Sequence, residues 1–350
     1  MSKKINVGLV GFGLSGQCFH APFISASENF NLLKVVERRE NKSQKLYPHS
    51  KTVKDISDLY DDREIDLIVI TTPTILHFDM AQKALLANKH VVVEKPFTMT
   101  SKEAHELIEL AKKRDKMLSV YQNRRWDGDF LTVKSIINNK LLGKLVEYEA
   151  HFDRFRNNIR ANAWQESVKS GGSILFDLGS HLIDQAQVLF GIPEQITADV
   201  RAQRKGSQII DNFELIMGYD KLKVTLKAGM LVRGESPHFI LYGTKGSFIK
   251  YGIDPQEDKL KQGISPLSKE WGTEAKKQWG TLNTQIKKLH FEGKVETISG
   301  AYAHYYDNIY EAITHKKELQ VKPEEAKNTI RIIELALQSN RERRTVPFTF

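Results

Sequence analysis

Asp177, His181 and Asp184 stand four and three residues apart within an otherwise apolar stretch. Such steps place all three side chains on one face of an α-helix. Because an imidazole exchanges its proton near neutral pH, we expect His181 to act as general base or acid at a substrate hydroxyl, with Asp177 orienting the imidazole or the substrate. Two alternatives stay open: a structural hydrogen-bond network, and a divalent metal site, for which no further ligand cluster is apparent.

A charged pair closes the apolar run Val91-Val92-Val93-Glu94-Lys95-Pro96. The run is typical of a buried parallel strand, and ligands bind at the carboxyl edge of the strands in open α/β sheets. Lys95 at that edge can donate a hydrogen bond to a substrate oxygen. A structural ion pair between Glu94 and Lys95 is the alternative interpretation.

Three glycines follow the apolar run Ile5–Val10 in the pattern G-x-G-x-x-G. The first permits a tight turn, the second lets the backbone approach a pyrophosphate, and the third allows close packing of the helix that follows. The N-terminus of that helix offers amide donors and the positive end of its dipole. We therefore interpret the loop as a dinucleotide-binding site and not as a glycine-rich turn without a ligand. The residues expected at the cofactor here are Gly11, Phe12, Gly13, Leu14, Ser15 and Gly16.

The choice between NAD and NADP depends on the end of the next apolar run, where Glu37 is followed by Arg38 and Arg39. A carboxylate at this point accepts hydrogen bonds from the adenosine ribose and repels a 2′-phosphate. Two guanidinium groups, in contrast, suit a phosphate dianion. Because Glu37 can turn away, the sequence favours NADP and leaves NAD open. The alternative is that the arginines are part of a solvated surface turn and do not contact the cofactor.

Strand-like and helical patterns alternate over the first 120 residues, and these elements must position the loop and the lysine. The alternation predicts βαβ units with a parallel sheet and helices on both faces. Helical periodicity covers residues 76–87 and 101–113. Strands are expected over residues 5–10, 32–37, 67–72, 90–93 and 118–121.

From about Gly143 the pattern changes to successive strand-like runs, several with tight links, which predict a mainly antiparallel sheet. One helix is expected over residues 173–190, and a last helix runs from Pro323 to a basic end. Residues 254–300 are polar and poorly periodic, and no structure is predicted for them. The strand-like runs cover residues 145–155, 194–203, 209–219, 223–231 and 238–242.

The expected fold class is α/β in two domains, which suits a chain of 350 residues. Residues 1–122 would form a dinucleotide-binding Rossmann domain. Residues 123–350 would form an α+β domain with a mainly antiparallel open sheet, which binds substrate and mediates oligomerisation. The C-terminal helix is a candidate to pack back on the first domain.

The composition, 40% hydrophobic and 27% charged, is that of a globular protein. There is no apolar run of the ~18 residues that span a bilayer, and the start of the chain lacks the pattern of a secretory signal, so we expect a soluble protein without a membrane partner. One cysteine, Cys18, and no zinc-type spacing fit a reducing, cytoplasmic location. The net charge of +9 is scattered among acidic residues, which argues against nucleic acid as a partner.

Taken together, these motifs resemble the Gfo/Idh/MocA oxidoreductase family over almost the whole chain. The resemblance includes the glycine loop, Thr71-Thr72-Pro73 with His77, Glu94-Lys95-Pro96, and Gly171-Gly172-Ser173 followed by Asp177 and His181. Two further segments, Tyr121-Gln122-Asn123-Arg124-Arg125-Trp126-Asp127 and Phe248-Ile249-Lys250-Tyr251-Gly252-Ile253-Asp254, resemble the branch that contains NADP-dependent scyllo-inositol dehydrogenases. Glu37 departs from that branch, where a small residue tends to precede a nearby arginine.

The resemblance implies an NAD(P)-dependent dehydrogenase acting on CH–OH donors, without a metal, that forms a homodimer or homotetramer through its open sheet. Lys95 would lie beside nicotinamide and substrate, Asp177 would bind or orient substrate, and His181 would be the acid/base. A cyclitol or sugar would be the substrate. The weaker expectations are cofactor contacts by Thr71, Thr72, Pro73, His77, Glu94, Asn123 and Arg124. His151, Asp153, Arg156 and Trp164 are candidates to line a polyol pocket, and the alternative is that they are ordinary sheet or interface positions.

The expected chemistry is transfer of hydride between a secondary alcohol carbon and nicotinamide, with His181 taking the hydroxyl proton and Lys95 polarising the oxygen. Two other classes of function are compatible with the fold. One is a nucleotide- or sugar-sensing regulator that has lost the chemistry. The other is a metal-dependent lyase or hydrolase built on Asp177 and His181. Retention of Lys95, Asp177 and His181 together favours the enzyme.

Overall fold

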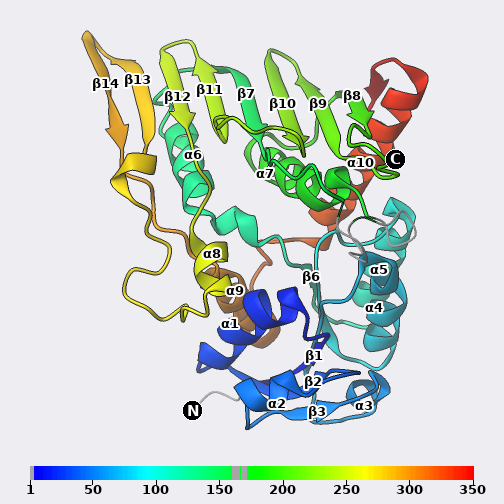
Figure 1. The fold of residues 1–350 in the computed structure, drawn as a ribbon. Helices are drawn as coiled ribbons and strands as arrows, with labels where there is room; N and C mark the ends of the chain where they lie inside the picture. Colours follow the sequence, from blue (N-terminus) through cyan, green and yellow to red (C-terminus); the bar gives the residue numbers. More distant parts are fainter. Residues whose placement is uncertain (1–3, 160–165, 167–171) are drawn as a thin grey trace. The chain divides into compact units, whose positions relative to one another are not determined.

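The computed structural model of the chain describes residues 4–159, 166 and 172–350. It divides into two compact units (Figure 1). The first unit comprises Met1–Asn123, Gln256–Trp271 and Ala301–Lys327, and the second comprises Arg124–Pro255, Gly272–Gly300 and Asn328–Phe350. The first unit thus contains two later segments that a division of the sequence at residue 122 leaves out.

The first unit is built on a six-stranded parallel sheet with strand order β3-β2-β1-β4-β5-β6. This is the order of a Rossmann sheet, so the expected fold is confirmed. The strand β3 was not predicted, because three residues with one apolar side chain give no periodic signal. The strands are β1 Ile5–Val10, β2 Phe30–Val36, β3 Lys51–Val53, β4 Leu67–Ile70, β5 His90–Val93 and β6 Leu118–Val120.

Helices cover both faces of this sheet, with α1 and α9 on one side and α4 and α5 on the other (Figure 1). The start of α5 is fixed by a capping box, in which Thr100 accepts from the backbone of Glu103 and the Glu103 carboxylate accepts from the backbone of Thr100. The helices of the unit are η1 Gly16–His20, α1 Ala21–Ala26, α2 Lys42–Leu46, α3 Ser57–Tyr60, η2 Thr74–Leu76, α4 His77–Leu86, α5 Ser101–Lys113, α8 Gln256–Lys261 and α9 Ala303–His315.

The second unit contains a nine-stranded sheet in the order β14-β13-β12-β11-β7-β10-β9-β8-β15. Only the β10–β7 pair within it is parallel, and the sheet ends at β14 and β15 without closing, so the expected open, mainly antiparallel sheet is confirmed. The strands are β7 Leu145–His151, β8 Gln195–Arg201, β9 Asn212–Tyr219, β10 Leu222–Gly229, β11 Phe239–Gly243, β12 Gly246–Lys250, β13 Gly280–Ile286, β14 Leu289–Val295 and β15 Val346–Pro347.

Alternate residues of these strands face the helices. In β7, Tyr148 and Ala150 are buried in the core, whereas Glu147 and Glu149 point to the opposite face. The helices α6, α7 and α10 contribute the other side of this core (Figure 1). The helices that lie within this unit or end in it are η3 Asn123–Trp126, α6 Gly128–Asn138, η6 Leu175–Gly179, α7 Ser180–Phe190, η7 Lys276–Gln278 and α10 Pro323–Glu342.

The segment 254–300, for which no structure is predicted from sequence, contains α8, η7 and the hairpin β13–β14. The hairpin turns through Lys287, whose φ of 56° lies in the left-handed region, and it carries mostly exposed side chains at one end of the sheet. An exposed edge hairpin buries little apolar surface and therefore leaves little periodic signal in the sequence. Among the described residues, no helix is both long enough and apolar enough to cross a membrane.

Candidate active site

The three glycines of the first loop each meet a different steric requirement. Gly11 has φ +94°, and a Cβ atom there would lie 2.9 Å from Oγ1 of Thr71. A Cβ atom on Gly16 would lie 2.3 Å from the carbonyl oxygen of Gly11, so the helix after the loop approaches too closely for any side chain. Nothing lies within 4 Å of the Cβ position of Gly13. The loop is therefore tight behind and open at Gly13, as a bound pyrophosphate requires.

The chain turns helical at Leu14, directly after Gly13, and Gly16–His20 forms a π-helical turn before α1. Such turns are rare and recur at functional sites. Leu14 is exposed, whereas Phe12 is buried and packs edge-on against Tyr47, with ring centroids 6.3 Å apart. The backbone that leads into the helix is thus anchored by Phe12, while the open side of the loop carries Gly13 and Leu14.

Glu94 connects this loop to the end of β5. Its Oε1 accepts hydrogen bonds from Ser15 Oγ and from His20 Nε2, the latter at 3.0 Å, and its Oε2 accepts from the backbone nitrogen of Lys95 at 2.9 Å. Burial opposes ionisation of Glu94, but the hydrogen bond from His20 and the other donors outweigh it and lower the pKa of the carboxyl. A buried carboxylate therefore joins the cofactor loop to the backbone of the candidate catalytic lysine.

Lys95 is half-buried and follows β5 at the carboxyl edge of the parallel sheet, where the Lys95–Pro96 peptide bond is cis. Thr71, Thr72 and Pro73 follow the neighbouring strand β4 at the same edge and are also half-buried. The Thr71 hydroxyl donates to the carbonyl oxygens of Val10 (2.9 Å) and Gly11 (3.1 Å). The structure thus brings the β4 segment, the glycine loop and Lys95 to one edge of the sheet.

His77 lies beneath this edge and is almost fully buried. Its Nε2 is 2.8 Å from the carbonyl oxygen of Thr72, and its Nδ1 is 3.0 Å from that of Pro96. Burial lowers the pKa of the imidazole. The side chain therefore holds the Thr72 and Pro96 segments together. These contacts suit a residue that supports the loops at the expected cofactor site.

Glu37 directly follows β2 and is buried as a residue. Its Oε1 accepts from the backbone nitrogen of Lys42 at 3.0 Å, and its Oε2 accepts from the backbone nitrogen and hydroxyl of Ser43 at 3.0 and 2.9 Å. Burial opposes ionisation, but the hydrogen bonds from Ser43 and Lys42 prevail and lower the pKa. Arg38 and Arg39 are exposed immediately after it. Both carboxylate oxygens are thus occupied by the start of α2.

The second unit contains the candidate acid/base. The predicted helix over residues 173–190 begins with the π-helical turn Leu175–Gly179 and continues as α7, so Asp177 lies in the π turn and His181 in the first turn of α7. Asp177 is half-buried and His181 is 4% exposed. The third member of the stripe has another partner: Asp184 accepts from Arg125 Nε at 2.7 Å and from its Nη2 at 2.6 Å. This buried bidentate pair gives Asp184 a structural role.

The predicted contacts Asn123 and Arg124 lie on the short helix η3 and are both buried. Arg124 donates to Asp127 Oδ2 at 3.1 Å, and its guanidinium carbon lies 4.8 Å from the ring centroid of Phe152. Its carbonyl oxygen accepts from the Gln185 side chain at 3.0 Å, which fixes η3 against α7. Arg124 is thus held by the second unit.

Of the expected polyol-pocket residues, Asp153 lies in a cavity of about 150 Å³ that also exposes His151, Ser236 and His238. Asp153 accepts from the backbone of Gly229 at 3.0 Å and from the Ser236 hydroxyl at 2.7 Å. Arg156 does not line this cavity and is exposed. The predicted Trp164 lies outside the described residues. His238 carries no local sequence signal, because the residues before β11 meet β7 only in the folded sheet.

A buried acid lies behind the cavity. Asp129 Oδ1 accepts from the backbone of Phe130 at 2.7 Å, while Oδ2 has no hydrogen-bond partner in the described part of the chain and lies 3.6 Å from His238 Nε2. Burial, with the neighbouring Asp254 carboxylate, raises the pKa of Asp129 to about 7, and burial lowers the pKa of His238 to about 3. Asp129 is therefore the buried acid that holds a proton close to neutral pH.

We predict that Asp129→Asn changes how stability depends on pH. With a folded pKa above the unfolded one, the wild type binds the extra proton only when folded, so its free energy of unfolding falls as the pH rises from 4 through 7. The free energy of unfolding of the variant does not fall in this way. Between pH 5 and 8 we expect it to rise by ~1 to 3 kcal/mol relative to that of the wild type, as measured by urea unfolding.

Asp211→Asn is the matched control. Asp211 is equally buried, but hydrogen bonds from Gln203 and Arg204 overcome burial and lower its pKa. This substitution should cost stability at pH 7 and less at pH 4, the opposite trend. A wild type and Asp129→Asn variant with parallel pH curves would contradict the burial of a neutral acid at this position.

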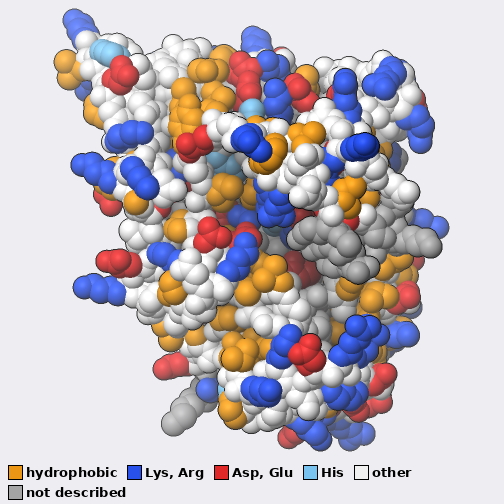
Figure 2. Space-filling model, in the orientation of Figure 1, with side chains coloured by type: hydrophobic (Ala, Val, Ile, Leu, Met, Phe, Trp, Pro, Cys, Tyr) orange, Lys and Arg blue, Asp and Glu red, His pale blue; other side chains and the backbone are white. Residues whose placement is uncertain are grey.

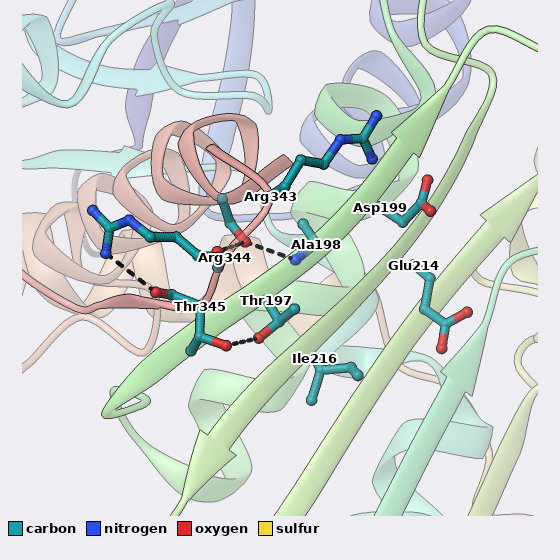
Figure 3. Close-up of a pocket in the computed structure, with 9 residues that line it drawn as sticks. Thr197, Ala198, Asp199, Glu214, Ile216, Arg343, Arg344 and Thr345 are labelled. Carbon is teal, nitrogen blue, oxygen red and sulfur yellow. Dashed lines mark hydrogen bonds between the residues drawn. The ribbon is translucent and has the colours of Figure 1, made fainter. Parts of the chain in front are cut away.

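A larger cavity of about 400 Å³ contains none of the predicted site residues (Figure 3). Asp199 and Glu214 stand on the neighbouring strands β8 and β9, and Arg343 reaches toward them from the end of α10 (Figure 3). Asp199 is paired with Arg201, and Glu214 lies 3.5 Å from Lys227. Basic side chains are likewise interspersed with acidic ones over the visible face in Figure 2. We assign no site to the larger cavity.

The fold and these contacts define a class of protein. A 3-2-1-4-5-6 parallel sheet whose first loop is open at Gly13 is a nicotinamide-dinucleotide-binding Rossmann domain, and the second unit adds an α/β domain with a mainly antiparallel sheet. Residues 5–122 match the family model described as the NAD-binding Rossmann fold of an oxidoreductase family, and residues 134–348 match its C-terminal alpha/beta domain. The chain belongs to the Gfo/Idh/MocA oxidoreductase family, as the sequence motifs indicate.

Similar proteins are known from several bacteria. The scyllo-inositol 2-dehydrogenase (NADP(+)) IolW of Bacillus subtilis is 38% identical, over 98% of this chain and 95% of its own. The uncharacterized oxidoreductase YdgJ of Escherichia coli is 40% identical over 99% of both chains. A crystal structure from Bacteroides fragilis, provisionally described as an oxidoreductase, has 46% identity and a TM-score of 0.92, and the match covers 99% of this chain and 100% of that one. The chain is therefore an oxidoreductase for small-molecule substrates.

Proposed function

We propose that the protein oxidises a secondary alcohol of a cyclitol or sugar, and reduces the corresponding ketone, with NADP preferred to NAD. The observation that carries the proposal is the carboxylate of Glu94, which ties the cofactor loop at Ser15 to the backbone of Lys95. The named activity of the similar B. subtilis protein, a scyllo-inositol 2-dehydrogenase, supports the polyol class of substrate.

In this proposal the residues of the chain have separate tasks. The loop from Gly11 to Gly16 holds the pyrophosphate, and the nicotinamide, when bound, accepts or supplies the hydride. Lys95 donates a hydrogen bond to the substrate oxygen and stabilises negative charge on it. His181 takes the hydroxyl proton during oxidation and returns it during reduction, and Asp177 orients the imidazole or the substrate.

The preference for NADP follows from the state of Glu37. A ribose-binding carboxylate needs oxygens that are available to the two ribose hydroxyls, but both oxygens of Glu37 already accept hydrogen bonds from Lys42 and Ser43. The carboxylate keeps its charge, but these donors direct it toward the start of α2. Arg38 and Arg39 are exposed directly after Glu37, and in this proposal they pair with that phosphate.

We predict that the double substitution Arg38→Ala/Arg39→Ala weakens NADPH binding by about tenfold to 100-fold and leaves NADH binding within about twofold. This range corresponds to the loss of one charged hydrogen bond to the phosphate, roughly 1.5 to 3 kcal/mol, and NADH has no such phosphate. Quenching of tryptophan fluorescence measures both dissociation constants. Arg114→Ala, which removes an exposed arginine after α5, is the control. Equal losses for the two cofactors would contradict the assignment.

A substrate screen tests the proposed activity itself. Inositols, aldoses and their keto forms are incubated with the protein and either NADP or NAD, in both directions, and absorbance of the reduced cofactor is followed. Turnover of a polyol with NADP is the expected result. Cofactor binding without turnover of any polyol would contradict the dehydrogenase proposal and favour a sensing role.

The second unit also supports a proposal about assembly. The sheet face opposite α6, α7 and α10 carries rows of paired charges, such as Glu147 with Lys223 and Glu214 with Lys227, around the less polar Ile216 and Ile240. We propose that this face joins copies of the chain into a homodimer or homotetramer. Light scattering measures the mass, and a monomer at micromolar concentration would contradict the proposal.

A further inference from the structure

A buried histidine and tyrosine stand behind Glu94, and neither was identified as a functional residue from the sequence. We propose that His20 and Tyr306 are positioning residues that fix the Glu94 carboxylate, and through it the cofactor loop and Lys95. The effect of these residues on turnover rests on the proposed function. Their effect on cofactor binding requires only that the first unit binds a dinucleotide.

Glu94 is the point where the two segments meet. One oxygen accepts from Ser15 in the cofactor loop and from His20, and the other accepts from the backbone of Lys95. Ser15 therefore cannot shift relative to Lys95 unless the carboxylate rotates. Since Oε1 is shared by Ser15 and His20, the donor on His20 limits that rotation.

The contacts of His20 fix which nitrogen carries hydrogen. The ionised Glu94 can only accept, so Nε2 of His20 donates to it across 3.0 Å. In the neutral imidazole, Nδ1 then accepts from the Tyr306 hydroxyl, 2.7 Å away. Burial keeps the phenol protonated by raising the pKa of Tyr306 well above its usual value. Tyr306 thus selects the tautomer of His20 that serves Glu94.

Tyr306 is itself held rigidly. It lies on α9 and is 1% exposed, and its ring packs edge-on against Phe30 and Tyr305 with centroid distances of 5.6 and 5.5 Å. His20 is 0% exposed, and its ring centroid lies 4.2 Å from that of Tyr121. With both rings confined, the hydrogen-bond chain from α9 to Glu94 has one available geometry. The segment Ala301–Lys327, far along the chain, thereby supports the cofactor loop.

Loss of His20 should therefore weaken binding of the cofactor. A buried carboxylate that loses a donor has its free energy raised and either takes up a proton or turns toward another donor. The charged and titratable groups around Glu94 are Lys95, His77 and His20 itself, and Lys95 is the cation among its remaining neighbours. A Glu94 carboxylate that turned toward the Lys95 side chain would release Ser15 and draw the lysine away from its substrate.

The test compares His20→Gln with His20→Asn, and Tyr306→Phe with Tyr305→Phe. The amide nitrogen of glutamine falls near the place of Nε2 and can still donate to Glu94, whereas that of asparagine falls near Nδ1 and cannot. Tyr305 is the matched control for its neighbour, because it is equally buried but its hydroxyl donates to Ser119 at 3.1 Å. The measurements are the dissociation constant for NADPH by fluorescence, kcat and KM for the polyol, and the melting temperature.

We expect His20→Asn to weaken NADPH binding by about tenfold, the effect of one lost hydrogen bond to a charged group, and to lower kcat with little change in the KM of the polyol. His20→Gln should restore most of both. Tyr306→Phe should weaken binding by about threefold, and Tyr305→Phe should leave it unchanged at a similar melting temperature. The proposal is overturned if the two tyrosine variants bind NADPH equally well, or if glutamine fails to rescue. NADPH binding that follows this order without polyol turnover by the wild type would support the positioning role and contradict the proposed function alone.

Discussion

Lys95→Met is expected to reduce kcat by about 10³-fold while the dissociation constant for NADPH changes by less than about twofold. Methionine keeps the apolar stem of the side chain and removes the ammonium group that stabilises negative charge on the substrate oxygen, a contribution of roughly 10² to 10⁴ in rate. The backbone nitrogen of residue 95, which donates to Glu94, is unaffected by the substitution. The cofactor loop should therefore remain in place.

The comparison is made with Lys102→Met, which removes an exposed lysine from the first turn of α5. Steady-state rates and NADPH titrations are measured for both variants and the wild type. Near-normal turnover in Lys95→Met would exclude Lys95 from the chemistry. Lost NADPH binding in the same variant would instead assign Lys95 to cofactor affinity.

The fold could be predicted from sequence to the extent that burial leaves a pattern. The strand Ile5–Val10 and the helix Ser101–Lys113 have the predicted bounds, because continuous apolar runs and helical periodicity mark them. The predicted start of the last helix at Pro323 is also confirmed. The hairpin β13–β14 escaped prediction, because β14 is mostly exposed and the buried positions of β13 are Gly280, Leu282 and Thr284, of which only Leu282 has a large apolar side chain.

The sequence predicted those parts of the candidate site whose interacting residues all lie within one short motif. The glycines of the loop show the expected steric roles, because their tasks depend on neighbours a few residues away. The role of Glu37 in cofactor choice could not be predicted from sequence. The backbone nitrogens of Lys42 and Ser43 fix the direction of its carboxylate, and they face it only after α2 forms. His20 and Tyr306 are 286 residues apart, so no local pattern in the sequence indicates that they form a hydrogen bond.

The substitution His181→Asn should lower kcat by about 10² to 10⁴ and remove a pH dependence that has opposite signs in the two directions. In the wild type, alcohol oxidation needs His181 without its extra proton, so its rate should rise with pH through the titration of this group. Ketone reduction needs the same group protonated, so that rate should fall over the same range. Asparagine cannot titrate, and both trends should disappear together.

This pairing of opposite trends distinguishes an acid/base from a group that only binds substrate. Loss of a binding group changes KM in the same way at every pH, whereas loss of the proton carrier abolishes both limbs of the profile at once. His290→Asn, on the β13–β14 hairpin of the same unit, removes an exposed imidazole and should leave both profiles intact. If His181→Asn keeps the rising and falling limbs, the proton is carried by another group. The half-buried Asp177 in the preceding π-helical turn then becomes the candidate, because it is the predicted site residue closest in sequence to His181.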